Sequence, residues 1–137
     1  MIVSDASALI KLALHEPESE IVFNKFKSFI KQGERISSPD IALAESLNAI
    51  WKHHVLLKDV SRHDLQTALE ITREVWSKIE KIQSEYISED AMNIAVQYKA
   101  SVYDSLYIAA CRLTSGKLFT FDSKLKQIAD SGGITTV

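Results

Sequence analysis

Two short apolar runs stand out along the chain because an aspartate ends each of them. Met1–Ser4 precedes Asp5, and Lys117–Phe121 leads into Asp122. Short, continuous apolar runs of this kind are typical of buried β-strands. Weaker strand patterns are found at Arg35–Ser37, Tyr86–Ile87 and Ile134–Thr136. The sequence therefore predicts about five short strands.

Apolar residues at helical spacing fill most of the remaining sequence. Residues three or four positions apart give each helix one apolar face. These stripes are Val22–Ile30, Leu43–Ile50, Leu65–Ile79, Ala91–Tyr98 and Leu106–Leu113, with a short last helix at Ser123–Ala129. Short strands separated by helices predict an α/β fold with a mostly parallel sheet that is covered on both faces.

Length and composition indicate one globular domain over residues 1–137. The chain is 46% hydrophobic and 25% charged, and its 4 Gly and 2 Pro do not gather into a linker. Its one cysteine, Cys111, excludes a disulfide framework and a paired-cysteine zinc site, so we expect a reducing, cytoplasmic setting. No apolar run has the length of a membrane span and no signal peptide is recognisable at the start, so we expect no membrane association.

The charge balance does not by itself indicate a nucleic-acid partner. The 16 Lys and Arg against 18 Asp and Glu give a net charge of −2, whereas simple nucleic-acid binders carry a basic excess. A divalent metal adds positive charge wherever carboxylates gather. A near-neutral nuclease that uses a metal is therefore compatible with this composition.

Asp5 and Asp122 are the first candidates for chemistry. In open parallel sheets, ligands bind beyond the carboxyl ends of the strands, which is where both aspartates are expected. The alternative is that each only caps the helix that follows it, because Asp is a favoured N-cap residue. The sequence leaves both interpretations open.

Glu45 and Asp104 are further candidates because neither has a counter-charge nearby on its helix. No Lys or Arg stands three or four positions from either acid. Glu45 has the alternative of being an exposed surface acid. Asp104 also fits a capping box that begins at Ser101, in which the acid reaches back to a free amide.

If four such acids lay together, burial and mutual repulsion would raise their pKa values unless a cation compensated the charge. Mg²⁺ prefers oxygen ligands and keeps several waters, and Mn²⁺ accepts similar sites. Such an ion assists phosphodiester hydrolysis by activating water and neutralising phosphoryl charge. The acids therefore predict a metal-dependent hydrolase if they converge.

Four segments together resemble the PIN-domain family, and most closely its VapC-like toxin branch. The resemblance spans essentially the whole chain, and the segments occur in the family's order. They are Asp5-Ala-Ser7 after the opening strand, Glu45 in the helix after Ser38-Pro39, the stretch Tyr103–Ala110, and Thr120-Phe121-Asp122.

This resemblance implies a three-layer α/β/α fold with about five parallel strands and a Mg²⁺- or Mn²⁺-dependent endoribonuclease. Its catalytic and metal-binding residues would be Asp5, Glu45, Asp104 and Asp122, and Ser7 and Thr120 would support them. The resemblance also implies a homodimer and a small antitoxin that inhibits it. We expect the antitoxin to dock on the helical region Ile21–Trp76, on apolar content alone.

Substrate contacts are less well defined by the sequence. The basic residues near the acidic segments are Lys11, Lys52, Arg112 and Lys124, each of which either meets a phosphate or is a solvated surface residue. The resemblance favours single-stranded or looped RNA as the substrate. Which RNA is cut, and whether one or two metals bind, is not encoded in a recognisable motif.

Two other functions are alternatives to the nuclease. An aspartyl-phosphate phosphatase requires a second Asp two residues after the first, where this chain has Ser7. A PIN-fold module without catalysis, which only binds RNA or protein, remains the alternative, although the presence of all four acids argues against it. Adjacent His53 and His54 point in different directions on a helix and are poorly placed to share a metal.

Overall fold

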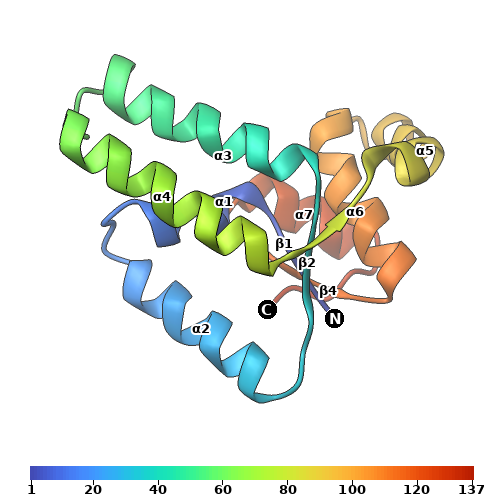
Figure 1. Cartoon of the computed structure of the whole chain (residues 1–137). Coiled ribbons are helices and arrows are strands. Elements are labelled where there is room, and N and C mark those ends of the chain that lie inside the picture. Colours follow the sequence, from blue (N-terminus) through green and yellow to red (C-terminus); the bar gives the residue numbers. More distant parts are fainter.

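The computed structural model describes residues 1–137, which form a four-stranded parallel sheet with helices on both faces (Figure 1). The strands are β1 (Ile2–Ser4), β2 (Ile36–Pro39), β3 (Glu80–Ile82) and β4 (Lys117–Phe119). The α-helices are α1 (Ala6–Ala13), α2 (Ser19–Lys31), α3 (Ile41–Trp51), α4 (Arg62–Lys78), α5 (Ser88–Tyr98), α6 (Val102–Thr114) and α7 (Ser123–Ser131). A π-helical turn, Lys52–Leu56, extends α3, and a 3₁₀ turn, Ser84–Ile87, precedes α5. No helix is both long and apolar enough to cross a bilayer.

The expected three-layer α/β/α architecture is confirmed. Helix α1 contacts α2, α3 and α4, and α3 and α4 form an antiparallel pair that extends from one side of the molecule (Figure 1). Helix α6 contacts β1, β2 and β4 directly, while α5 and α7 pack against α6. Because β1 and β2 are almost wholly buried, both faces of the sheet centre are covered.

The order of strands in the sheet creates a switch point between β1 and β4. The order is β3-β2-β1-β4, so the chain runs outward from β1 through β2 to β3 and then returns to the other side of β1. Ser4 of β1 pairs with Phe119 of β4. Crevices for ligands form beyond the carboxyl ends of strands at such a point. Asp5 and Asp122 follow these two strands.

The predicted strands need two corrections. The sheet has four strands where about five were expected, because Ile134–Thr136 contributes only an isolated parallel bridge between Thr136 and Leu118. Tyr86–Ile87 lies in the 3₁₀ turn, and the third strand is Glu80–Ile82, directly after α4. Because Glu80 and Lys81 are exposed, this edge strand has no apolar pattern that would reveal it.

The main core is built around Phe119, whose ring is almost completely buried on β4. The rings of Phe26 and Phe29 from α2 and of Phe121 meet it edge to face, with centroids 5.4 to 5.5 Å away. Aromatic pairs of this geometry stabilise beyond their buried area. This cluster fixes α2 against β4, the strand that leads into Thr120 and Asp122.

We expect Phe119→Ala to lower the free energy of unfolding by about 3–5 kcal/mol, because it removes buried contacts and leaves a cavity. The control is Phe23→Ala on α2, whose side chain is 54% exposed and which should cost less than about 1 kcal/mol. Urea denaturation followed by circular dichroism measures both values. Equal losses for the two variants would contradict this account of the core.

Candidate active site

The site begins with the side chain of Asp5, which is buried where β1 ends. Its Oδ2 accepts a hydrogen bond from Thr120 Oγ1 at 2.5 Å, and the backbone N–H of Asp5 donates to the Phe119 carbonyl at 3.1 Å. Thr120 Oγ1 also accepts from the backbone N–H of Asp122 at 3.0 Å. One threonine hydroxyl therefore joins the segments that carry two of the predicted acids.

Ser7 makes a second link between the same two segments. Its Oγ donates to the Asp5 carboxylate, 2.7 Å from Oδ1 and 2.9 Å from Oδ2, and accepts from the backbone N–H of Phe121 at 2.8 Å. Ser7 and Thr120 therefore both contact Asp5 and the chain that follows β4. The supporting role that the family resemblance implies for Ser7 and Thr120 stays a prediction, and these contacts are the observation on which it rests.

Asp5 and Asp122 are also helix caps, so the alternative interpretation describes part of their role. Asp5 Oδ1 accepts from the backbone N–H of Ala8, and Asp122 Oδ1 accepts from that of Leu125, each at 3.0 Å. Capping occupies one oxygen of Asp122 and leaves Oδ2 without a hydrogen bond in the protein. Capping and ligand binding are therefore compatible at Asp122.

Glu45 and Asp104 reach the same place from α3 and α6. The Tyr107 hydroxyl donates to Glu45 Oε1 at 3.4 Å, and the Tyr107 ring is buried. Ser101 caps α6 by accepting from the backbone N–H of Asp104 at 3.1 Å, but the Asp104 carboxylate makes no return bond. The capping box is therefore only half formed, and the carboxylate of Asp104 is left available.

Tyr107 lines the pocket but was not singled out as a site residue in the sequence. It stands one helical turn after Asp104, so the two share a face of α6. That spacing was the available signal, but a buried tyrosine at helical spacing looks like a core residue in the sequence. Its contact with Glu45 depends on how α3 packs against α6.

One pocket of about 280 Å³ collects the four acids. Its lining includes Asp5, Glu45, Asp104 and Asp122, together with Ser7, Asn48, Lys52 and Tyr107. Thr120 does not line the pocket but lies behind Asp5, to which it is bonded. Acids that are as far as 117 residues apart along the chain (Asp5 and Asp122) thus share a single pocket.

Burial and mutual repulsion make this pocket costly for negative charge. Burial raises the pKa of Asp5, although the hydrogen bonds from Thr120, Ser7 and Ala8 oppose this shift. Burial also raises the pKa of Glu45 to about 7; the Tyr107 hydrogen bond opposes the rise, and Asp104, Asp5 and Asp122 add to it. No Lys or Arg forms an ion pair with Asp5 or Glu45, although Lys52 lines the pocket and Lys124 lies near Asp104.

The basic candidates divide into two groups. Lys52 lines the acidic pocket and makes no ion pair, and Lys124 Nζ lies 4.0 Å from Asp104 Oδ2. Lys11 lines an adjoining hollow, where it pairs with Glu16 and Glu18. Arg112 is held by Asp90 and does not line the pocket. Of the four, Lys52 is best placed to meet a phosphate.

A divalent cation fits the charge of this pocket, but not as a closed protein cage. No three His, Cys, Asp or Glu side chains lie close enough together to hold a metal ion among themselves. Mg²⁺ is usually held by one or two carboxylates and keeps several waters, which suits acids spread around a pocket. Burial of the Asp5 and Glu45 carboxylates without a basic partner, which raises the pKa of both, is the observation that favours a cation here.

His53 and His54 each contact a different polar group. His53 Nδ1 lies 2.9 Å from Asp59 Oδ1, whereas His54 Nδ1 lies 2.7 Å from the Val60 carbonyl. The two rings therefore have different partners, as their adjacent helical positions suggest.

A parallel sheet with a switch point between β1 and β4, and an acidic pocket beyond it, are the arrangement of a PIN domain. The PIN-domain family model matches residues 2–131, and the chain belongs to this family.

Individual relatives are similar over most of their length. Ribonuclease VapC3 of Pyrobaculum aerophilum is 29% identical over 129 residues, which is 92% of each chain. The fold also matches Mycobacterium tuberculosis VapC20, described as a Sarcin-Ricin loop cleaving toxin, with a TM-score of 0.71, 13% identity, and 100% and 98% of the two chains covered. A toxin-antitoxin complex from Klebsiella pneumoniae gives a TM-score of 0.62 at 20% identity, covering 90% of this chain and 88% of that one.

The raised pKa of Glu45 predicts how stability depends on pH. Between about pH 4.5 and about pH 7 folded Glu45 binds a proton that unfolded Glu45 has released, so stability falls as pH rises through this window. Glu45→Gln should remove this loss, and bound Mg²⁺ should reduce it in the wild type.

Urea denaturation at several pH values, with and without Mg²⁺, measures the effect. Glu70→Gln is the control, because Glu70 is an exposed acid on α4 outside the pocket. If the free energy of unfolding depended on pH in the same way in the wild type and in Glu45→Gln, the pKa of Glu45 would not be raised in the folded protein.

Proposed function

We propose that the chain is a metal-dependent endoribonuclease that hydrolyses RNA phosphodiester bonds in the cytoplasm as the toxin of a toxin-antitoxin pair. The observation that carries the proposal is the single pocket lined by Asp5, Glu45, Asp104 and Asp122. The ribonuclease name of the VapC3 relative supports the reaction class. The toxin-antitoxin complex among the structural neighbours supports the inhibitory partner.

The four acids would line the site of Mg²⁺ or Mn²⁺, with one or two of them as direct ligands and the others facing its bound waters. The ion, when bound, would supply positive charge to a phosphoryl oxygen and make water more acidic. Ser7 and Thr120 hold the Asp5 carboxylate in one orientation through three hydrogen bonds. Tyr107 does the same for Glu45, whose pKa of about 7 lets it hold or release a proton near neutral pH. Lys52 would contact a phosphate of the strand.

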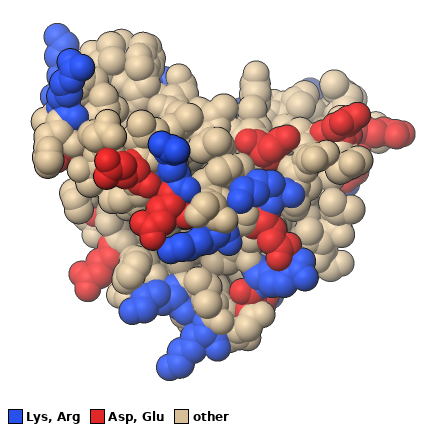
Figure 2. Space-filling model, in the orientation of Figure 1, with Lys and Arg blue, Asp and Glu red and all other residues tan.

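Surface charge favours a substrate that enters the pocket over a long duplex bound along one face. On the face shown in Figure 2, Lys and Arg side chains alternate with Asp and Glu, and no continuous basic surface is visible. Duplex binding depends on neutralising many phosphates. A single-stranded or looped RNA, which can place one phosphodiester in the acidic pocket, is therefore the substrate class we propose.

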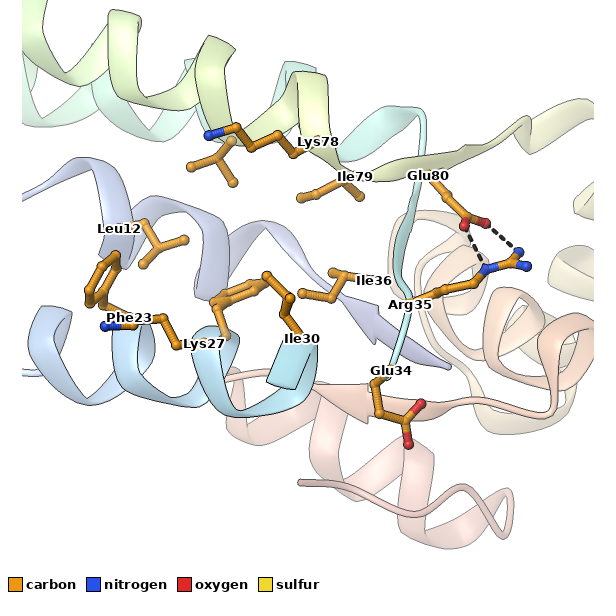
Figure 3. A pocket seen from close by; sticks show the side chains of 12 residues that line it. Leu12, Phe23, Lys27, Ile30, Glu34, Arg35, Ile36, Lys78, Ile79 and Glu80 are labelled. Atoms are coloured by element: carbon orange, nitrogen blue, oxygen red, sulfur yellow. Dashed lines mark hydrogen bonds and ion pairs between the residues drawn. The ribbon is translucent and has the colours of Figure 1, made fainter. Parts of the chain in front are cut away.

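The antitoxin would dock in an apolar groove on a different part of the molecule. A cavity of about 430 Å³ lies between α2 and α4, and its lining includes Phe23, Phe26, Ile30, Val75 and Ile79 (Figure 3). Phe23, Lys27 and Ile30 belong to one face of α2 and line the groove. Such a groove suits the apolar face of an amphipathic helix. It falls largely within Ile21–Trp76, the region that the sequence suggested.

The alternative is a PIN-fold module that binds RNA or protein without cleaving it. Such a module would bind metal or RNA and release no product.

We also expect a homodimer, from the family resemblance.

We expect Asp104→Asn to lower RNA cleavage in Mg²⁺ or Mn²⁺ by about 100-fold or more, because it removes a carboxylate charge from the pocket. Asp5→Asn should act similarly, and Asn keeps the N-cap of α1. Gel analysis of an RNA panel, with and without chelator, measures cleavage.

The matched control is Asp64→Asn. Asp64 follows the Ser61 cap of α4 as Asp104 follows the Ser101 cap of α6, but it lies outside the pocket. Cleavage should survive this change. If Asp104→Asn instead destabilised the fold, while the molecules that stay folded kept their specific activity, Asp104 would be a helix cap and not a catalytic residue. Metal binding by a wild type that cuts no RNA would favour the inactive module.

We expect Ile30→Asp to prevent association with the antitoxin, because it places a charge in the apolar groove. The control is Ile21→Asp, an exposed isoleucine on the same helix that does not line the groove. Each variant is co-expressed with the product of a short open reading frame next to this gene, and co-purification is measured. Retention of the partner by Ile30→Asp would exclude this groove as the docking site.

A further inference from the structure

The acidic pocket continues into a second hollow along α3 and the start of α6. This hollow, of about 440 Å³, is lined by Ala44, Glu45, Asn48, Ser101, Tyr103 and Asp104. Glu45, Asn48 and Asp104 line both spaces, so the two adjoin. A strand that brings a phosphate to the acids therefore has room to extend over Asn48 and Tyr103.

The ring of Tyr103 is largely uncovered and has no polar or aromatic partner within the chain. Its side chain is 60% exposed, it stacks on no other aromatic ring, and its hydroxyl makes no hydrogen bond. Tyr107, one turn further along α6, is by contrast buried and bonded to Glu45. An apolar ring left in water directly beside Asp104 is available to a ligand.

Asn48 is the second unused group in this hollow. It follows Glu45 by three residues, so both lie on the same face of α3. Its side chain is exposed, and its amide makes no hydrogen bond within the protein. An amide offers two donors and one acceptor, which suits the edge of a nucleic-acid base.

The charges of the adjoining spaces indicate which part of a nucleotide enters the second hollow. Apart from the two shared acids, its lining is uncharged, whereas the hollow on the other side of the pocket contains Lys11, Glu16, Glu18 and His53. A neutral lining with an exposed aromatic ring suits a base, because bases of single-stranded RNA stack on aromatic side chains. The phosphate would then lie in the acidic pocket, near Lys52.

We propose that Tyr103 and Asn48 form a nucleotide subsite, in which Tyr103 stacks on the base next to the scissile phosphate and Asn48 hydrogen-bonds to the edge of that base. The subsite rests on the proposed ribonuclease function and adds to it a position at which base identity is sensed. Tyr103 and Asn48 position the strand and take no part in the chemical step.

Binding of a fluorescein-labelled single-stranded RNA of about 12 nucleotides tests the subsite without cleavage. Fluorescence anisotropy is measured in the Asp5→Asn background. Tyr103→Ala should weaken binding by about tenfold, within the roughly 5- to 150-fold range of one lost stacking contact, whereas Tyr103→Phe should stay within about twofold. Tyr86→Ala is the matched control, because Tyr86 is 78% exposed and lies outside the pocket, and it should change nothing.

Cleavage by enzyme with intact acids locates the stacked base. Once the cut in a reactive RNA is mapped, an abasic nucleotide is placed beside the cut or farther away. An abasic nucleotide beside the cut should lower the cleavage rate of the wild type about as much as Tyr103→Ala does, and it should lower the rate of Tyr103→Ala no further. At a more distant position, the effects of the abasic nucleotide and of Tyr103→Ala on the rate should add. Asn48→Ala should narrow the differences in kcat/KM among the four bases at that position.

The possible outcomes separate this proposal from the proposed function. If Tyr103→Ala binds and cuts RNA like Tyr86→Ala, the subsite is wrong while the ribonuclease stands. If RNA binding depends on Tyr103 but the wild type never cuts, the ribonuclease is wrong; Tyr103 then contacts a base of bound RNA, and its position beside a scissile phosphate is overturned. Absence of RNA binding overturns both. If light scattering shows that Tyr103→Ala loses RNA only because a dimer dissociates, Tyr103 belongs to a protein interface and the subsite is overturned.

Discussion

The hydrogen bond from Thr120 to the Asp5 carboxylate is the contact on which the arrangement of the site depends. It joins the ends of β1 and β4, which are neighbours in the sheet although more than a hundred residues separate them. The same hydroxyl accepts the backbone N–H of Asp122, so the orientations of both acids are coupled. The aromatic cluster around Phe119 stabilises this contact, because it fixes the strand that leads into Thr120.

This constraint keeps negative charge where water cannot solvate it well. Hydrogen bonds from Ser7, Thr120 and Ala8 only partly offset the burial of Asp5, and Glu45 is left with a pKa of about 7. Carboxylates held in this way destabilise the fold at neutral pH unless a cation or a proton joins them. The same feature that costs stability is what would favour binding of the divalent ion in the function that we propose.

Surfaces of different chemical character lie on different parts of the molecule. Carboxylates gather at the switch point of the sheet, uncharged groups continue from them along α3 and α6, and an apolar groove opens between α2 and α4. The RNA strand and the antitoxin helix that we propose would therefore bind to different surfaces. Because α1 contacts both α2 and α3, the groove and the acidic pocket are connected through a single helix.

The sequence by itself indicated the alternation of strands and helices and singled out the four acids as candidates, because short apolar runs that end in Asp and helical acids without a counter-charge are local patterns. The order of the four segments along the chain carried the resemblance to the PIN-domain family. It did not determine β3, whose edge position leaves Glu80 and Lys81 exposed and without an apolar signature. Only the tertiary structure decided that Tyr107 reaches Glu45, that Lys52 lines the pocket while Arg112 is held by Asp90, and that Tyr103 stays uncovered. Those facts depend on how α3, α5 and α6 pack, and packing between distant segments is set by the shapes of buried faces, which no short stretch of sequence contains.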